Sequence, residues 1–258
     1  MDSLDDVFGA AIRDRSHGAA EIEGRLIDGL LARRGAWIRD DLRAGAVALL
    51  DGQPAMANLR SLSRRLGGEN LDEIEAWLRR RASTLDELPE RLGAAAWTHL
   101  EGSTRLVTLS RSSAVAAVLE HVWRRGWRGE TVVLDGSPAG RGVEQAAALA
   151  RLLSPVRSQP DATAPSWLDG RGCLVVIGAD AISSRRLVNA CGTAALVELA
   201  GSRSIPVLAV ADTGKDIPDA DIDGLVANLP KVEGDGPGRC WPVFDVTPSA
   251  WVTTRIHE

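Results

Sequence analysis

Residues 174–200 read LVVIGADAISSRRLVNACGTAALVELA and carry the most informative pattern of the chain. The apolar run from Cys173 to Ile177 ends in Gly178-Ala179-Asp180, a short polar turn follows, and a run rich in Ala and Leu begins at Thr193. The pattern predicts a buried strand with a carboxylate at its carboxyl end, followed by a loop and a helix. Ligands of open parallel sheets bind at that edge, so Asp180 is the first candidate for chemistry.

Strands and helices alternate on both sides of this stretch. Short β runs are expected at 105–109, 131–134, 173–177 and 206–211, and helical periodicity covers 112–127, about 143–153 and 193–200. This alternation favours an α/β fold with a doubly wound parallel sheet and right-handed crossovers. Of the remaining segments, 160–169 is expected to be a loop or short helix and 216–238 a long surface loop, and the chain closes with the runs 241–246 and 251–254.

The first hundred residues have a helical pattern instead. Apolar residues recur at helical spacing in four segments, 22–31, 42–50, 59–66 and 71–78, the third ending at Gly67-Gly68 and the last starting after Asn70 as a cap. No convincing strand precedes residue 104. The predicted organisation is therefore an amino-terminal helical domain, 1–100, joined to a Rossmann-like domain, 101–258.

Composition excludes several classes of function. The 258 residues carry a net charge of −5 and no basic stripe, which argues against a nucleic-acid partner. The amino terminus does not resemble a signal peptide and no apolar run approaches membrane-spanning length, so we expect a cytoplasmic protein without a membrane partner. Cys173, Cys191 and Cys240 lack metal-site spacing, and the four histidines form no local pair. We expect reduced thiols, no metal and no cofactor.

Four segments fall at the expected ligand edge, and each has a functional and a structural interpretation. Ser110-Arg111-Ser112-Ser113 follows a strand, where hydroxyl and backbone N–H groups can hold an anion or the serines can simply cap a helix. The segment 135–142 can cradle a phosphate, with Arg141 adding charge, or form a structural turn. Asp180, with Asn189 nearby, can be functional or cap a helix, and Lys215 is most simply a solvated loop lysine.

Five blocks of sequence carry a resemblance to a known family. They are VTLSRSSAVAAVL, GADAISSRRLVNACGT, IPVLAVADTGK, the terminal FDVTPSAWVTTRIHE and, more faintly, HGAAEIEGRLIDGL near the start. In this order they resemble the translation initiation factor 2B alpha/beta/delta superfamily, which also contains methylthioribose-1-phosphate isomerase and ribose-1,5-bisphosphate isomerase. The resemblance covers nearly the whole chain. It implies a helical amino-terminal domain on a Rossmann-like domain, usually dimerised through the latter.

The resemblance also assigns positions to the isomerase site. The isomerase branch interconverts an aldose 1-phosphate and a ketose 1-phosphate, with a Cys and an Asp as acid and base. The Asp corresponds to Asp180, but the Cys position is Ser110, whose hydroxyl is a poor proton donor or acceptor without a partner base. The four positions where the isomerases carry cationic groups are here His17, Gln53, Ser137 and Ala190.

These departures lead us to expect a non-catalytic member of the superfamily. It would act in binding or regulation as a homodimer, with a sugar phosphate or nucleotide in the residual cleft. The alternative is an aldose–ketose sugar-phosphate isomerase with a remodelled site; a guanine-nucleotide-exchange component is a third reading. In the first two of these interpretations, Asp180 and Ser110 occupy the catalytic positions of the isomerases. The expected ligand contacts are Arg111, Ser112, Arg141, Asn189, Lys215, His17 and Gln53.

Overall fold

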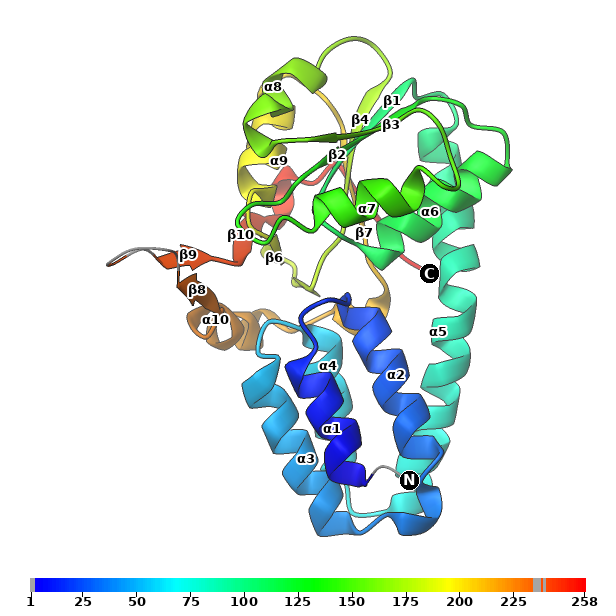
Figure 1. The fold of residues 1–258 in the computed structure, drawn as a ribbon, viewed down its shortest axis with the longest axis vertical. Helices are drawn as coiled ribbons and strands as arrows, with labels where there is room; N and C mark the ends of the chain where they lie inside the picture. Colours follow the sequence, from blue (N-terminus) through cyan, green and yellow to red (C-terminus); the bar gives the residue numbers. More distant parts are fainter. Residues whose placement is uncertain (1–2, 234–237, 239) are drawn as a thin grey trace.

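Five α-helices form one end of the molecule (Figure 1). The computed structural model describes residues 3–233, 238 and 240–258. The helices are α1 (Leu4–Arg13), α2 (Ala19–Leu31), α3 (Arg39–Gly52), α4 (Ala57–Leu66) and α5 (Leu71–Leu100). Ser3 starts α1 with a capping box that includes Asp6, and Asn70 caps α5 as predicted. Their apolar stripes meet in one core, where Ile27, Leu30 and Leu42 are fully buried.

Helix α5 belongs to two hydrophobic clusters. Ile74 and Leu78 in its first half pack among α1–α4, whereas Leu92 and Leu100 in its second half pack against the sheet. The helix therefore runs along the whole molecule (Figure 1). It crosses the helix α6 (Ser113–Arg124) at Gly93, where an added Cβ would stand 2.3 Å from the ring of His121. Only glycine allows this close approach of the two helices.

A six-stranded parallel sheet forms the other end. Its order is β11-β7-β4-β1-β2-β3, and every neighbouring pair is parallel. The strands are β1 (Arg105–Leu109), β2 (Glu130–Leu134), β3 (Val156–Gln159), β4 (Cys173–Ile177), β7 (Val207–Val210) and β11 (Thr254–Ile256). The predicted α/β class is confirmed. Strand β3 was missed because its sequence, VRSQ, is largely polar at a sheet edge.

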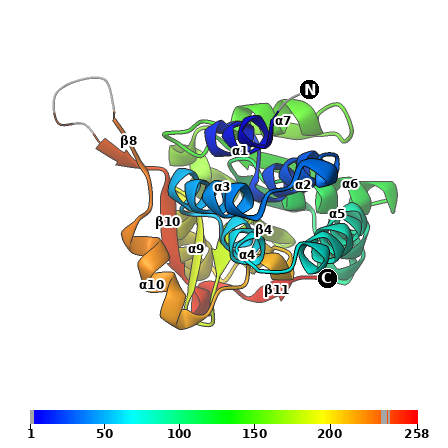
Figure 2. The same ribbon diagram turned by 90° about the horizontal axis from the view of Figure 1, so that it is seen from below.

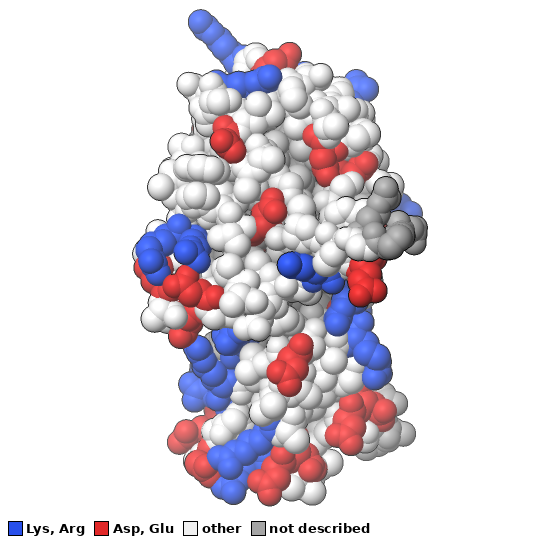
Figure 3. Space-filling view, turned by 90° about the vertical axis from the view of Figure 1, so that its left-hand side faces the viewer, with Lys and Arg blue, Asp and Glu red and all other residues white. Residues whose placement is uncertain are grey.

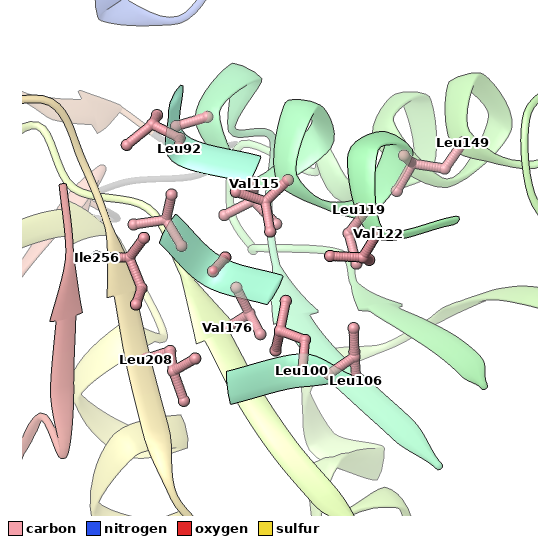
Figure 4. Close-up of a cluster of buried hydrophobic side chains, with 14 of the residues drawn as sticks. Leu92, Leu100, Leu106, Val115, Leu119, Val122, Leu149, Val176, Leu208 and Ile256 are labelled. Atoms are coloured by element: carbon pink, nitrogen blue, oxygen red, sulfur yellow. The ribbon is translucent and has the colours of Figure 1, made fainter. Parts of the chain in front are cut away.

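Helices cover the sheet. They are α6, α7 (Gly142–Leu149), α8 (Ala164–Trp167) and α9 (Thr193–Ser202). Figure 4 shows the cluster in which side chains of α5 and α6 meet those of the sheet. Its labelled members are Leu92, Leu100, Leu106, Val115, Leu119, Val122, Leu149, Val176, Leu208 and Ile256. A strand that is apolar along its whole length, such as β4, is expected where a parallel sheet is buried on both faces.

A small antiparallel sheet departs from the expected order. The polar stretch after Asp180, expected to be a turn, contains β5 (Ala181–Ile182) and β6 (Arg186–Ala190). Strand β6 pairs with β10 (Phe244–Pro248), more than fifty residues further along the chain. Because the partner is remote, local periodicity could not predict it.

The long loop expected at 216–238 is also corrected. It contains α10 (Asp219–Ala227) and β8 (Lys231–Glu233), while its residues 234–237 lie outside the described part of the chain. Strand β8 pairs with β9 (Cys240–Pro242) in a hairpin that projects from the body of the molecule (Figures 1 and 2).

Candidate active site

A cavity of about 480 Å³ lies where the helical end meets the carboxyl edge of the sheet. Its walls come from the loops after β1, β2, β4 and β7, from the segments after α1 and α3, and from the start of β8. All nine residues singled out from the sequence line this one cavity: Asp180, Ser110, Arg111, Ser112, Arg141, Asn189, Lys215, His17 and Gln53. The topology thus brings together groups that are up to 198 positions apart, from His17 to Lys215 (215 − 17).

The backbone of Asp180 is held on both sides. Its N–H donates to the carbonyl of Val188 at 2.8 Å, and its carbonyl accepts from the N–H of Ala57, the first residue of α4, at 3.0 Å. A strand follows Asp180, so the alternative that it caps a helix is wrong. Burial raises the pKa of its carboxyl, and the positive charges of Lys215 and Arg141 offset only part of that effect. A carboxyl that retains its proton to higher pH suits acid–base work.

Lys215 is buried, with 5% of its surface exposed, so the expectation of a solvated loop lysine is wrong. Its Nζ donates to the carbonyl oxygen of Ala179. The lysine ends a short 3₁₀ turn, Thr213–Lys215, that Asp212 caps by accepting from the N–H of Gly214 at 2.9 Å. The ammonium group is therefore fixed beside Asp180.

A buried charged trio supports this turn from the helical end. The guanidinium of Arg81, on α5, donates to both carboxylate oxygens of Glu23 at 2.7 Å and to Asp212 at 2.8 Å. Glu23 and Asp212 side chains are each 1% exposed. Burial opposes the effect, but hydrogen bonds and charge attraction from the two carboxylates raise the pKa of Arg81. The trio connects α2 and α5 to the turn that carries Lys215.

Ser110 and Ser112 occupy different positions in the β1–α6 loop. Ser110 has φ 59°, the left-handed region that non-glycine residues seldom adopt. Gly136 packs so closely that a Cβ on it would stand 2.5 Å from the Cβ of Ser110. Ser112 caps α6 by accepting from the N–H of Val115 at 3.3 Å, so its structural interpretation is confirmed. Ser112 also packs on Gly178, where a Cβ would stand 2.4 Å from Oγ.

Arg111 bridges the two ends of the molecule. It donates to both carboxylate oxygens of Glu21 at 3.0 Å and to the carbonyl of Ser16. A ligand would have to share this guanidinium with Glu21. These contacts connect α2 to the β1–α6 loop.

The glycine-rich segment 135–142 is organised as a structural turn. The carboxylate of Asp161 accepts from the N–H of Gly136 at 2.8 Å and of Ser137 at 2.7 Å. The N–H groups that a phosphate would need at the start of this turn are therefore already paired. Arg141 is different: its side chain has no hydrogen bond or ion pair to any described residue, and it acts on Asp180 through its charge.

His17, Gln53 and Asn189 are largely engaged by the protein. His17 Nδ1 lies 2.7 Å from the carboxylate of Asp14. The amide nitrogen of Gln53 donates to the carbonyls of Ala11 and Asp14, at the end of α1, at 3.0 and 2.8 Å. Asn189 donates to the hydroxyl of Thr193 at 3.0 Å. For Gln53 and Asn189, the amide oxygen is the atom left to meet a ligand.

Several residues at the cavity were not found from the sequence. Arg15 and Lys231 line it directly. Arg15 lies two positions before His17, so its closeness to that segment was an available signal. Lys231 is brought in by the hairpin, and Arg81 acts from behind the wall; neither has a local pattern that indicates the site. Cys191 does not line the cavity.

Two findings about the described residues concern metal sites and membrane-spanning helices. No group of three or more His, Cys, Asp or Glu side chains in them is arranged to hold a metal ion. No helix in that part of the chain has the length and apolarity to cross a membrane.

The chain belongs to the Initiation factor 2 subunit family, whose sequence profile it matches over residues 24–258. The resemblance expected from the five blocks is thereby confirmed. Among solved structures, the translation initiation factor eIF-2B of Pyrococcus horikoshii OT3 superposes with a TM-score of 0.86 at 20% identity, over 98% of this chain and 94% of that one. The 5-methylthioribose 1-phosphate isomerase of the same organism gives 0.73 at 20% identity, over 98% and 82%. These similarities establish the fold.

Relatives at higher identity are isomerases. A ribose 1,5-bisphosphate isomerase of Haloterrigena turkmenica is 27% identical, over 96% of this chain and 84% of the relative. A methylthioribose-1-phosphate isomerase of Anaeromyxobacter sp. (strain K) is 30% identical, over 99% and 84%. These relatives contradict the expectation of a non-catalytic regulatory module, which gave too much weight to the lost thiol and cationic groups. The alternative, an isomerase with a remodelled site, agrees better with them.

Proposed function

We propose that the protein is an aldose–ketose isomerase acting on a sugar phosphate, with a remodelled active site. The observation that carries the proposal is the arrangement around Asp180. A carboxyl with a raised pKa lines a cavity with Lys215 and Arg141, in a chain 30% identical to an isomerase over nearly its whole length. A catalytic acid or base needs a pKa near the working pH, and burial moves Asp180 in that direction.

The reaction requires balanced movement of hydrogen. Converting a cyclic aldose 1-phosphate to its ketose moves the hydrogen of C2 to C1, gives a proton to the ring oxygen, and takes one from the C2 hydroxyl. As a carboxylic acid, Asp180 can donate the proton to the ring oxygen; as a carboxylate, it can accept the hydroxyl proton. Ser110 lies at the position of the family's cysteine and is assigned to hydrogen bonding of the substrate, because its hydroxyl is a weak acid.

The cationic and polar groups position the substrate. Lys215 and Arg141 supply positive charge on the Asp180 side of the cavity. Asn189, Gln53 and His17 offer further polar contacts along its wall. The remaining two assigned residues, Ser112 and Arg111, shape the loop after β1.

The test is direct. Purified protein is incubated separately with methylthioribose 1-phosphate and ribose 1,5-bisphosphate, and ketose product is followed by NMR. We expect turnover of at least one compound and its loss in Asp180→Asn. Absence of ketose from both compounds, or full turnover by Asp180→Asn, would contradict the proposal.

We also propose that the chain forms a homodimer through its α/β part. A chain of the tetrameric eIF2B-beta2-delta2 complex from C. thermophilum has the same fold, with a TM-score of 0.78 at 17% identity. On this chain, α9 contains a single charged residue, Glu198, and the surrounding face is largely uncharged in Figure 3. Trp251 next to α9 is 43% exposed. Light scattering is expected to give a dimer for the wild type and a monomer for Trp251→Glu.

We propose a cytoplasmic location, supported by three free thiols.

A further inference from the structure

A second hollow adjoins the candidate active site. It has a volume of about 520 Å³ and lies between α1 and α7, which overlap when the molecule is seen from below (Figure 2). We call it the α1–α7 hollow; its charged lining consists of Arg13, Asp14, Arg15, Arg141 and Glu144. Asp14, Arg15 and Arg141 also line the candidate active site, so the two spaces adjoin at these side chains.

Positive charge predominates in the α1–α7 hollow. Three guanidinium groups face two carboxylates, which leaves one net positive charge. Asp14 is engaged by the protein, because its carboxylate accepts from the backbone N–H groups of Ser16 at 2.9 Å and His17 at 3.0 Å. Burial opposes the effect, yet these hydrogen bonds hold the pKa of Asp14 at about 2. Glu144 is exposed and can turn toward water.

The three arginines differ in how firmly they are held. Arg15 is fixed by hydrogen bonds to the carbonyls of Ile12 at 2.6 Å and Gly52 at 3.2 Å. Arg141 is half-buried, and its side chain has no hydrogen bond or ion pair among the described residues. Arg13, at the end of α1, is exposed. A rigid guanidinium beside two adaptable ones forms a setting in which an anion can gain several charge-assisted hydrogen bonds.

The positions where related isomerases carry cations do not offer such a setting here. His17 is paired with Asp14, and the amide nitrogen of Gln53 is used by carbonyls at the end of α1. Positive charge has instead gathered one segment away, in the α1–α7 hollow.

We propose that the α1–α7 hollow is the anion subsite of this protein and takes the phosphate monoester group of its substrate, with Arg13, Arg15 and Arg141 as ligands. Arg141 borders both spaces, so a phosphate held there leaves the sugar carbons facing Asp180. The identity of the substrate as a sugar phosphate rests on the proposed function; the binding of phosphate does not.

The experiment uses inorganic phosphate and ribose 5-phosphate as probes, titrated into the full chain at low salt by calorimetry. We expect Arg141→Gln and Arg13→Gln each to weaken binding by about tenfold or more, as the loss of a charge-assisted hydrogen bond implies. Arg151→Gln is the matched control, since Arg151 is exposed just beyond the end of α7 and outside the hollow. Glu144→Gln removes a repelling carboxylate and is expected to tighten binding. Unchanged melting temperatures confirm that the variants are folded.

The outcomes separate the subsite from the activity. Equal phosphate affinity in the wild type, Arg13→Gln and Arg141→Gln would overturn the subsite, as would an equal loss in Arg151→Gln. Weaker binding in Arg13→Gln and Arg141→Gln, with no ketose formed from any sugar phosphate, would retain the subsite and contradict the proposed function. If both proposals hold, Arg13→Gln raises KM with little change in kcat, because Arg13 lines only the hollow.

Discussion

The buried ammonium group of Lys215 donates a hydrogen bond to the carbonyl oxygen of Ala179, the residue immediately before Asp180. This contact joins the turn after β7 to the end of β4, two neighbouring strands of the sheet. It places a fixed positive charge beside the candidate acid–base group. Burial raises the pKa of Asp180, and this charge is the first of the two that oppose it.

Replacing Lys215 by Met should therefore change the pH dependence of turnover. Without the ammonium charge, the pKa of Asp180 rises further, because burial is then opposed by Arg141 alone. The limb of the kcat/KM profile that reports the ionisation of Asp180 is expected to move to higher pH. The measurement is a full pH–rate profile of both proteins. A limb that stays in place while the rate falls would assign Lys215 to packing rather than to electrostatics.

Lys231 provides the matched control, since the sequence contains only these two lysines. It also lines the cavity, but it is exposed and is not among the charges that shift Asp180. Lys231→Met is expected to leave the limb where it is.

Asp180→Asn should abolish turnover and yet stabilise the fold near neutral pH. The folded pKa of Asp180 is raised, so its contribution to stability is full below its ordinary value of 3.8 and is lost as the pH rises through the folded pKa. Asparagine never ionises and avoids that loss. We expect the melting temperature to rise by roughly 2–4 °C at pH 8, the shift for about 1 kcal/mol in a chain of this size. The difference should vanish toward pH 4; a variant less stable at pH 8 would refute the expectation.

Ser110→Cys restores a thiol where the family's isomerases carry cysteine. A thiol has a pKa of about 8.5 and exchanges protons far more readily than a serine hydroxyl. We expect kcat to rise by about tenfold or more. A well-positioned acid–base group can contribute up to ~10²–10⁴-fold. Ser110→Ala is the companion variant and should lower kcat by less than about tenfold, because the hydroxyl only positions substrate. A Cys variant no faster than the Ala variant would mean that proton transfer does not pass through this position.

Arg81→Met should destabilise the protein by about 3–5 kcal/mol, because it leaves two buried carboxylates without their partner. Arg79, on the same helix, pairs with Glu75 at an exposed site where its side chain is 63% accessible. Arg79→Met is therefore the control and should cost less than about 1 kcal/mol. Urea denaturation at pH 7 measures both. Similar costs for the two variants would mean that the trio of Arg81, Glu23 and Asp212 contributes no more than a surface ion pair.

Local pattern identified much of the fold and the best candidate at the site. The apolar run before Gly178 predicted a buried strand, and Ser112 was recognised as a possible helix cap from its position alone. Such features depend on residues within one turn or one strand of each other. The division into domains at residue 100 stays a prediction, and α5 contributes to the hydrophobic cores on both sides of it.

Features built from remote residues were missed. Strand β6 is stabilised by β10, and the buried Lys215, in the loop after β7, donates to Ala179 in the loop after β4. The sequence shows a lysine in a loop; only the packing around that loop decides whether water reaches it.

By itself, the sequence determined the alternation of strands and helices and placed Asp180 at the carboxyl end of a buried strand, since apolar spacing and chain direction are local properties. Only the tertiary structure decided which charges surround that carboxyl. Lys215 and Arg141 act on Asp180, whereas Arg111 is paired with Glu21 and His17 with Asp14. Burial and Coulomb interactions depend on distances between segments that the sequence leaves far apart.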